Sequence, residues 1–295
     1  MEFARVRLGE VNRCETITRS AAGKGTNVAH VLHTLGTRTV LMSFCGGDTG
    51  RLWLDDVARI GIPAEIVRTH SATRICQTLI DRSTGEVTEL VREAPLPTQA
   101  EWATFFRRFE ARLRRAQLAV IAGALMPGAR ETVCFDLVRR ARAHGVPVVI
   151  DSQKTPLTKT LSHRPLLVKL NVHELENTLR CRLRSEKQII AGAQRLIDRG
   201  AQQTVVTHGA RGAWLVLPDR AWRFAPPRIR ALNPIGSGDG VTAGIAYGIV
   251  KGWNVVEAVR LGIGCGSANA LTLTPGNVDL RTVRKLARKV VVRAV

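Results

Sequence analysis

The strongest chemical signal in the sequence is a run of small residues that ends in a carboxylate. The tripeptide Gly236-Ser237-Gly238 is followed at once by Asp239, and an apolar stretch of small residues then predicts a helix. Backbone N–H groups at the start of a helix are unpaired, and the helix dipole is positive there, so together they favour an anion. This segment therefore predicts a phosphate site.

Asp239 has two interpretations at this position. A carboxylate at the start of a helix is often an N-cap, which accepts a hydrogen bond from a free backbone N–H group. A carboxylate beside a bound phosphate can also be the general base that takes the proton from an attacking hydroxyl during phosphoryl transfer. The residues alone leave both interpretations open.

A second glycine-rich turn lies near the start of the chain. Gly23-Lys24-Gly25 and Asn27 precede a helix that we expect over His30–Leu35. The spacing is not that of a P-loop, so a tight turn before a helix is one interpretation. Lys24 and Asn27 also place a cation and an amide beside exposed backbone, which suits a sugar phosphate or its hydroxyl groups.

The elements that must position these residues follow a repeating order from Gln117 onward. Short apolar runs alternate with longer amphipathic stretches, which is typical of βα units around a mostly parallel sheet that is buried on both faces. The predicted strands are Leu118–Ala122, Val146–Ile150, Leu166–Leu170 and Thr204–Thr207, and the predicted helices include Ala129–His144 and Glu186–Arg199.

Two regions depart from this order and predict β-hairpins. One joins Arg74–Ile80 to Glu86–Val91, and the other joins Trp214–Leu217 to Trp222–Phe224. The first hairpin and the segment Phe3–Thr18 are expected to form a small sheet over a cleft. Such lids exclude water from a reacting phosphate.

Composition narrows the class of protein. The 295 residues are 45% hydrophobic and 23% charged, as expected for a globular chain. No window approaches the roughly 18 apolar residues of a membrane span, and no signal peptide is recognisable, so we expect a cytoplasmic protein. The six cysteines show no zinc or disulfide spacing.

The net charge of +20 favours anionic ligands. The basic residues are spread along the whole chain and aromatic residues are only 4%, whereas a nucleic-acid reader concentrates both on one surface. A positive surface also raises the local concentration of small anions. We therefore expect phosphorylated substrates rather than a nucleic-acid partner.

In this order, the two glycine-rich segments resemble the two signatures of the pfkB carbohydrate kinases, and the first is most similar to the 1-phosphofructokinase and tagatose-6-phosphate kinase branch. Further segments match in the expected order: Cys45–Gly50, Thr73-Arg74, Ala122–Pro127, Ile150–Ser152, Val168–Glu174, Thr207–Gly212 and Gly266–Asn269. The resemblance covers essentially the whole chain.

The fold that this resemblance implies is ribokinase-like. It is an α/β fold, a three-layer α/β/α domain with a mostly parallel central sheet plus a small β-sheet lid. The lid would comprise residues 1–20 and 64–96, and the nucleotide- and sugar-binding core residues 21–63 and 97–295.

The resemblance also implies roles for single residues. Asp239 matches the catalytic base, and Gly236, Ser237 and Gly238 match the anion hole for the transferring phosphate. The residues that match the sugar site are Gly23, Lys24, Gly25 and Asn27, together with Arg74 for the phosphate of the substrate. A planar guanidinium suits that anion better than lysine does.

The nucleotide side is implied in the same way. Glu174, with Asn171, matches an element that orders Mg²⁺ through water near the phosphates of ATP. Without the resemblance, Glu174 would be interpreted as a carboxylate on a helix surface. The other positions that match ATP-binding residues of the family are Lys169, Thr207, Gly209, Gly212 and Asn269.

Three features depart from the family pattern. Ala124 replaces a frequent serine near the sugar, and Leu170 replaces a proline between Lys169 and Asn171. The family also begins with a core strand and an Asn-Pro turn whose aspartate binds sugar hydroxyls, and this chain starts after it. We expect Met1 to be an internal start, with the strand encoded upstream.

The resemblance therefore implies transfer of the γ-phosphoryl group of Mg-ATP to a phosphorylated ketohexose, with fructose 1-phosphate giving fructose 1,6-bisphosphate as the favoured reaction. A homodimer paired through the lid is expected. The alternatives are a kinase for tagatose 6-phosphate or another sugar, and a catalytically weak ligand-binding relative that lacks the first core strand.

Overall fold

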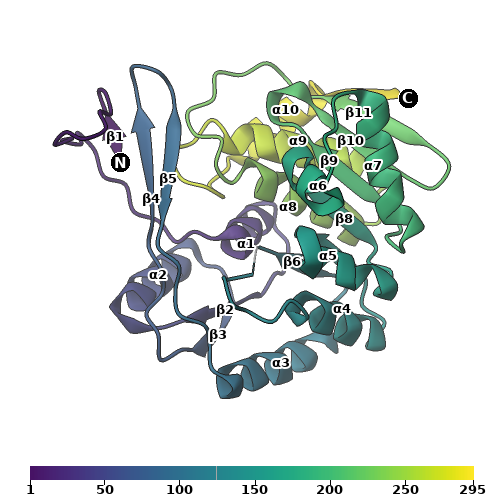
Figure 1. Ribbon diagram of the computed structural model, residues 1–295, viewed down its shortest axis with the longest axis horizontal. Helices are drawn as coiled ribbons and strands as arrows, with labels where there is room; N and C mark the ends of the chain where they lie inside the picture. Colours follow the sequence, from purple (N-terminus) through teal and green to yellow (C-terminus); the bar gives the residue numbers. More distant parts are fainter. Residues whose placement is uncertain (124) are drawn as a thin grey trace.

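A computed structural model describes residues 1–123 and 125–295, and its centre is a seven-stranded sheet in the order β12-β11-β10-β9-β8-β7-β6 (Figure 1). Strands β6 to β9 are parallel, and β10 to β12 continue the sheet in antiparallel pairings. The strands are β6 (Ala119–Ala122), β7 (Val148–Asp151), β8 (Leu167–Asn171), β9 (Thr204–Thr207), β10 (Ala213–Val216), β11 (Ala221–Ala225) and β12 (Val291–Ala294).

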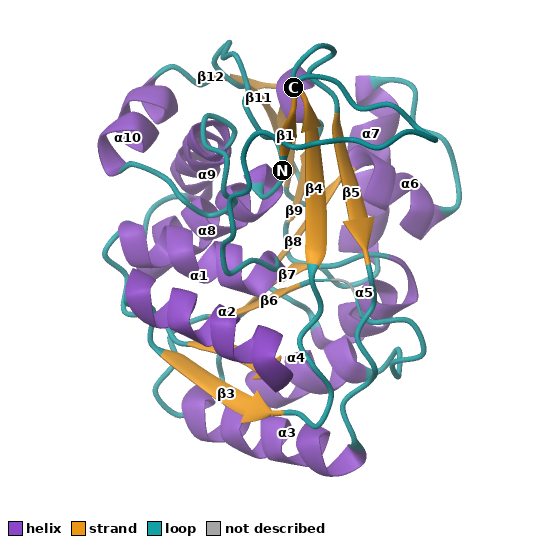
Figure 2. Cartoon of the chain, turned by 90° about the vertical axis from the view of Figure 1, so that its left-hand side faces the viewer, coloured by secondary structure: helices purple, strands orange, loops and turns teal. Residues whose placement is uncertain are grey.

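Helices cover both faces of this sheet (Figure 2). One layer contains α4 (Val133–Ala143), α5 (Lys154–Thr160), α6 (Val172–Leu179) and α7 (Glu186–Asp198). The other contains α1 (Lys24–Thr34), α8 (Ser237–Val250), α9 (Val255–Asn269) and α10 (Leu280–Arg288). The expected three-layer α/β/α fold is confirmed.

Alternation along the strands explains why both faces are covered. Val148 and Ile150 pack into the core beneath α4 to α7, whereas Val149 between them packs with Val241 and Ile245 of α8. Successive side chains of a strand point to opposite faces, so an unbroken apolar run needs a helix layer on each side. By the same alternation, Asp151 falls on the face of Val149, toward α8.

Strands β2 (Leu41–Cys45) and β3 (Ala64–Arg68) form a separate parallel pair. Helix α2 (Gly47–Ile60) connects the two strands, and α3 (Gln99–Leu113) lies against β3. In the described residues neither strand is hydrogen-bonded to the edge strand β6. Phe44 of β2 and Ile121 of β6 nevertheless pack against the same cluster, which includes Phe105. The two sheets therefore share a core without sharing backbone hydrogen bonds.

The small sheet comprises β1 (Glu2–Phe3), β4 (Cys76–Asp81) and β5 (Val87–Val91), and its hairpin projects from the rest of the molecule (Figure 1). Asp81 fixes the hairpin turn by accepting hydrogen bonds from the backbone and hydroxyl of Ser83, and it accepts another from Val6 N. Ala64–Arg68 lies within the range expected for the lid but pairs with β2. The division into lid and core remains a proposal.

The predicted boundaries differ most at two helices. The helix expected over His30–Leu35 already begins at Lys24, directly after Gly23 in a left-handed conformation with φ 120°. The helix expected from Ala129 begins only at Val133. Ala124 lies outside the described residues. In the part of the chain that the structure describes, no helix is long and apolar enough to cross a membrane.

Glycines allow α8 and α9 to pack backbone against backbone. A Cβ atom at Gly244 would lie 2.5 Å from Gly262 Cα, and one at Gly266 would lie 2.7 Å from Ser237 O. Real side chains do not tolerate such distances, so the helices would have to separate. The position of the amino end of α8 therefore depends on this contact.

Gly244→Ala should lower the free energy of unfolding by about 1–3 kcal/mol, because the added methyl group overpacks a backbone contact. Chemical denaturation would measure the change. The matched control is Gly192→Ala in α7, where the nearest atoms are leucine side chains at 3.1–3.3 Å that can shift. Equal stability of the two variants would contradict a rigid contact between α8 and α9.

Candidate functional site

The predicted site residues converge at the carboxyl ends of the parallel strands. Asp151 ends β7 and is opposite Lys169 of β8, while Asn171 ends β8 and is opposite Thr207 of β9. Helix α6 begins directly after β8, and the glycine-rich start of α8 lies against Lys169, since a Cβ at Gly238 would be 2.8 Å from Lys169 Nζ. Carboxyl ends of parallel strands are where open α/β sheets bind ligands.

Two lysines and two carboxylates form a connected cluster here. Lys24 Nζ donates to Asp151 Oδ1 at 2.9 Å and to Glu174 Oε1 at 3.2 Å. Lys169 Nζ donates to Asp151 Oδ2 at 2.8 Å. Thr242 Oγ1 of α8 donates to the same oxygen at 3.0 Å. The cluster therefore ties α1, β7, β8, α6 and α8 together.

The charges of this cluster stabilise one another. Burial alone would raise the pKa of Asp151, but Lys169 and Lys24 outweigh it and the pKa is lowered. Burial would lower the pKa of Lys24, and Asp151 and Glu174 outweigh it in the same way, so that pKa is raised. Lys24 and Asp151 are therefore charged at neutral pH.

Asp239 lies in the first turn of α8 and is 5% exposed. Burial raises its pKa to about 6, and a hydrogen bond from Asn27 Nδ2 at 2.7 Å partly opposes this effect. In the described residues the N-cap of α8 is Gly236 and no side chain caps the helix. The interpretation of Asp239 as a helix cap is therefore wrong.

Asn27 presents an unused acceptor next to Asp239. The residue is 5% exposed, and its Oδ1 atom finds no hydrogen-bond partner in the part of the chain that the structure describes. A buried acceptor without a donor costs free energy, and native structures usually satisfy it with water or a ligand. A hydroxyl group placed here could supply the missing donor.

Asn171 and Glu174 form a capping box at the start of α6. Glu174 N donates to Asn171 Oδ1, and Asn171 N donates to Glu174 Oε2, both at 2.8 Å. Glu174 is buried rather than on the helix surface, and its other oxygen faces Lys24. The spacing of Asn171 and Glu174, which suggested a metal-binding element, is thus also the spacing of a capping box that satisfies backbone N–H groups at the start of the helix.

Asn269 connects two loops around the glycine-rich segment. Its Nδ2 atom donates to Ile235 O at 2.7 Å, and its Oδ1 atom accepts from Gly276 N at 2.7 Å. Gly236 packs against this side chain, as a Cβ built on Gly236 would lie 3.2 Å from Asn269 Oδ1. Gly236 also has φ 81°, in the left-handed region. Asn269 therefore fixes the approach to α8, and contact with a nucleotide stays a prediction.

Gly209 begins a 3₁₀ turn, Gly209–Arg211, that follows β9, and Gly212 comes directly after the turn. Gly212 has φ 113°, and a Cβ there would lie 2.4 Å from Phe224 O, so no side chain fits. Nothing lies within 4 Å of a Cβ built at Gly209, which leaves its backbone open. The turn is therefore accessible near the strand end that carries Thr207.

Arg74 is not joined to the cluster. It precedes β4, is partly exposed, and forms an ion pair with Glu93 at the base of the hairpin. Its neighbour Thr73 is fixed to the start of α2, since Thr73 N donates to Gly46 O at 2.8 Å. A role for Arg74 in binding the phosphate of the substrate stays a prediction.

Sequence reasoning did not select Asp151 and Thr242. The available signal was a carboxylate that ends the apolar strand Val148–Asp151 at the same sheet edge as Lys169. A charged residue at such a place is rarely buried unless it is paired.

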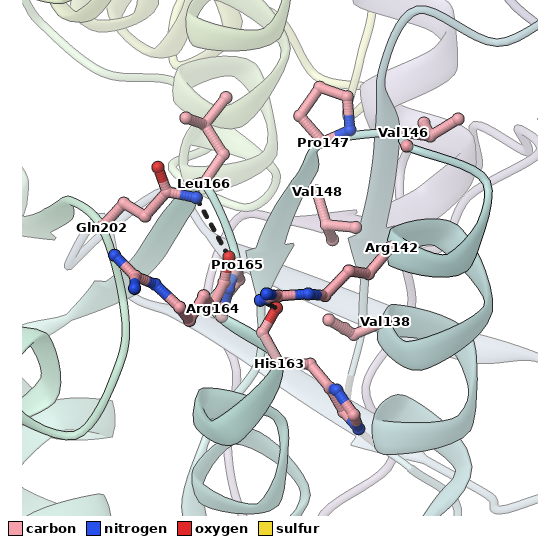
Figure 3. A pocket seen from close by; sticks show the side chains of 11 residues that line it. Val138, Arg142, Val146, Pro147, Val148, His163, Arg164, Pro165, Leu166 and Gln202 are labelled. Atoms are coloured by element: carbon pink, nitrogen blue, oxygen red, sulfur yellow. Dashed lines mark hydrogen bonds between the residues drawn. The ribbon is translucent and has the colours of Figure 1, made fainter.

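A separate hollow of about 370 Å³ opens at the opposite, amino ends of β7 and β8 (Figure 3). It is lined by Val146 and Val148 before and at the start of β7, by Arg164 and Leu166 before β8, and by Gln202. None of the predicted site residues lines it. The described residues also contain no cluster of three or more His, Cys, Asp and Glu side chains that could hold a metal ion by itself.

Comparisons with known proteins agree with this arrangement. A model of the pfkB family carbohydrate kinases matches residues 1–280. The ATP-dependent 6-phosphofructokinase isozyme 2 of Mycobacterium tuberculosis is 30% identical over 272 residues, which are 92% of this chain and 79% of that protein.

Solved structures show the same fold. A possible 1-phosphofructokinase of Thermotoga maritima is 25% identical, with a TM-score of 0.87, and the match covers 100% of this chain and 95% of that one. Phosphofructokinase-2 of Escherichia coli, solved with substrates and products, is 23% identical with a TM-score of 0.88, covering 98% and 94%. The chain therefore belongs to the pfkB family of carbohydrate kinases, which are phosphotransferases with an alcohol group as acceptor.

Proposed function

We propose that the chain transfers the γ-phosphoryl group of ATP to a hydroxyl group of a phosphorylated ketohexose, with fructose 1-phosphate as the favoured substrate. The observation that carries this proposal is the pair of buried acceptors, Asp239 and Asn27, at the glycine-rich start of α8, which no side chain of the described residues caps. A hydroxyl donor and a phosphate anion are the two ligands that this arrangement accommodates.

Asp239 serves as the general base. With a pKa of about 6, it is mostly ionised at neutral pH and is a stronger base than an exposed aspartate. It accepts the proton of the substrate hydroxyl. Asn27 Oδ1 accepts a hydrogen bond from a second hydroxyl group of the sugar and so orients it.

The developing negative charge lies at the start of α8. Gly236, Ser237 and Gly238 provide the backbone N–H groups of this helix start, and the Lys169 ammonium lies against Gly238. The Ser237 N–H donates to Pro234 O at 3.1 Å, so it would have to exchange this bond for the phosphate. Donors that are already in place stabilise the transition state without having to reorganise. These groups form the anion hole.

ATP enters from the side of β8 and β9, with Thr207, Gly209, Gly212, Asn171 and Asn269 on the nucleotide side. Mg²⁺ is usually bound by one or two carboxylates together with phosphates and water. Glu174 fits this requirement through water, because its Oε1 atom lies outside the capping box and faces the cluster. When bound, Mg²⁺ neutralises charge on the phosphates of ATP.

Lys24 and Arg74 favour a substrate that already carries a phosphate, which argues against an uncharged nucleoside. The relatives include a protein named as a 6-phosphofructokinase and one named as a possible 1-phosphofructokinase. Fructose 6-phosphate and tagatose 6-phosphate are therefore the competing substrates. A coupled kinase assay over all three sugar phosphates would rank them, and no turnover with any of them would favour a weak ligand-binding relative.

A homodimer through the lid is the proposed assembly. Ile75, Leu90 and Val91, at or next to β4 and β5, are exposed apolar side chains. Pairing two lids would cover them. A cytoplasmic location stays a prediction.

Asp239→Asn should lower kcat by about 10²–10⁴ while leaving ATP binding nearly unchanged, because the general base is lost and the shape is kept. In the unaltered protein, kcat should fall as the pH is lowered through about 6, when Asp239 becomes protonated. Steady-state kinetics from pH 5 to 9 would measure both effects. More than about half of the original turnover at saturating substrate would show that Asp239 is not the base.

The same variant should be more stable than the unaltered protein above pH 6. The folded pKa is raised from 3.8 to about 6, so the contribution of Asp239 to stability is present below about pH 4 and is lost as the pH rises through 6. Removing the charge should regain on the order of 2–3 kcal/mol at pH 8 and little at pH 4, measured by denaturation.

Asp81→Asn is the matched control for this stability change. Hydrogen bonds from Ser83 and Val6 lower the pKa of Asp81 to about 2, so its contribution is present above pH 4 and is lost as the pH falls through 2. The control should therefore be destabilised at neutral pH. If both variants lose stability at pH 8, burial does not penalise the charge of Asp239.

Arg74→Ala should raise the KM for the sugar phosphate about 30-fold with little change in the KM for ATP, because a charge-assisted pair worth about 2 kcal/mol is lost. Glu93→Gln is the control, since it frees Arg74 from its ion pair and should not raise the KM. An equal rise in the KM for the sugar phosphate and the KM for ATP would instead show that Arg74 supports the lid in general.

A further inference from the structure

Asp151 is a buried carboxylate for which the proposed reaction has no direct use. It has 0% exposure, and both of its oxygens accept hydrogen bonds, from Lys24 on one side and from Lys169 and Thr242 on the other. A buried charge is retained only where it is paired and hydrogen-bonded. Asp151 and Glu174, which accepts from Lys24 at 3.2 Å, together balance the charges of the two lysines.

The two lysines come from elements that are distant in sequence. Lys24 begins α1, and Lys169 lies in β8. A lysine side chain is a flexible point charge, so its ammonium group is held in one place only by its partners. Asp151 is the partner common to both, at a fixed position where β7 ends.

We propose that Asp151 is a positioning residue for phosphoryl transfer, which holds the ammonium groups of Lys24 and Lys169 at the amino end of α8, beside Asp239. This inference rests on the proposed function. The Lys169 ammonium lies against Gly238, where the anion is expected, and Lys24 connects the same carboxylate to Glu174. Without Asp151, the Lys169 ammonium would be free to pair with Asp239 or with solvent, and Lys24 would keep Glu174 as its partner.

Asp151 also acts on Asp239 through its charge. The charged groups that face Asp239 are Asp151 from β7, Lys169 from β8 and Lys24 from α1, and Asp151 raises its pKa whereas the lysines lower it. The packed helix α9 contributes Cys265, a thiol that stays neutral because burial raises its pKa to about 12. Loss of the Asp151 charge therefore makes Asp239 a weaker base.

The test is Asp151→Asn in the full chain, assayed with ATP and the sugar phosphate that the unaltered protein phosphorylates best. The expected result is a fall in kcat of about 10²-fold, the usual consequence of misplacing groups by about 1 Å. The acidic limb of the kcat profile should also shift to lower pH. A carboxylate that only holds strands together would not shift this limb, so an unshifted limb overturns the proposal.

Asp81→Asn is the matched control, since it removes another buried and hydrogen-bonded carboxylate, in the hairpin turn. It should leave the acidic limb where it is. A shift of the same size in both variants would show a general effect of destabilisation and would overturn the proposal.

A second variant covers the case in which Asp151→Asn does not fold. Asp151→Asn/Lys169→Met removes an opposite pair of charges, and Glu174 still holds Lys24. Its kcat should be within about threefold of that of Lys169→Met alone, because the carboxylate then has little left to position. A further loss of about tenfold or more would show that Asp151 does not act through Lys169.

Assays of the unaltered protein distinguish a failure of the proposed function from a failure of the inference on Asp151. If it phosphorylates none of the three sugar phosphates, the proposed function fails and this inference fails with it. If it is active while Asp151→Asn keeps its turnover and its pH profile, this inference alone is wrong.

Discussion

The carboxylate of Asp151 must be neutralised at the place where the sheet puts it, and much of the site is arranged to do so. It ends an apolar strand that is covered on both faces, so water does not reach it. Lys169 is its direct neighbour on the next strand, and Lys24 approaches from the start of α1. Because an unpaired charge here would cost several kcal/mol, α1, β7 and β8 are held in one arrangement.

The proposed anion site at the start of α8 has to keep a fixed position relative to that arrangement. The start of α8 is fixed from two directions: Thr242 donates to Asp151, and the glycines of α8 and α9 bring their backbones into contact. Asn269 adds a third constraint by binding the loop before the helix. Glycine is therefore needed in α8 and α9 for close packing, and at Gly236 for a left-handed backbone with φ 81° before α8, which are two different physical reasons.

Periodicity predicted most of the central fold, because doubly buried strands and amphipathic helices leave clear patterns. The strand Thr204–Thr207 was predicted with its observed bounds. The start of α1 was missed because Gly23-Lys24-Gly25 has weak helix propensity, and only its tertiary contacts place Lys24 in the helix. The separation of β2 and β3 from the main sheet depends on pairing between strands distant in sequence, which local patterns do not encode.

For the candidate site, motifs and the family resemblance selected most of the residues, and the structure supplied the relations among them. Asp239 and Asn27 were selected separately, but their hydrogen bond and the unused acceptor of Asn27 appear only when α1 and α8 meet. The burial that brings them together also raises the pKa of Asp239 to about 6. An exposed aspartate would be more stable as an anion and a weaker base. The basicity on which the proposed role of Asp239 depends thus has the same physical origin as the cost of this residue to folding, namely the burial of its carboxylate.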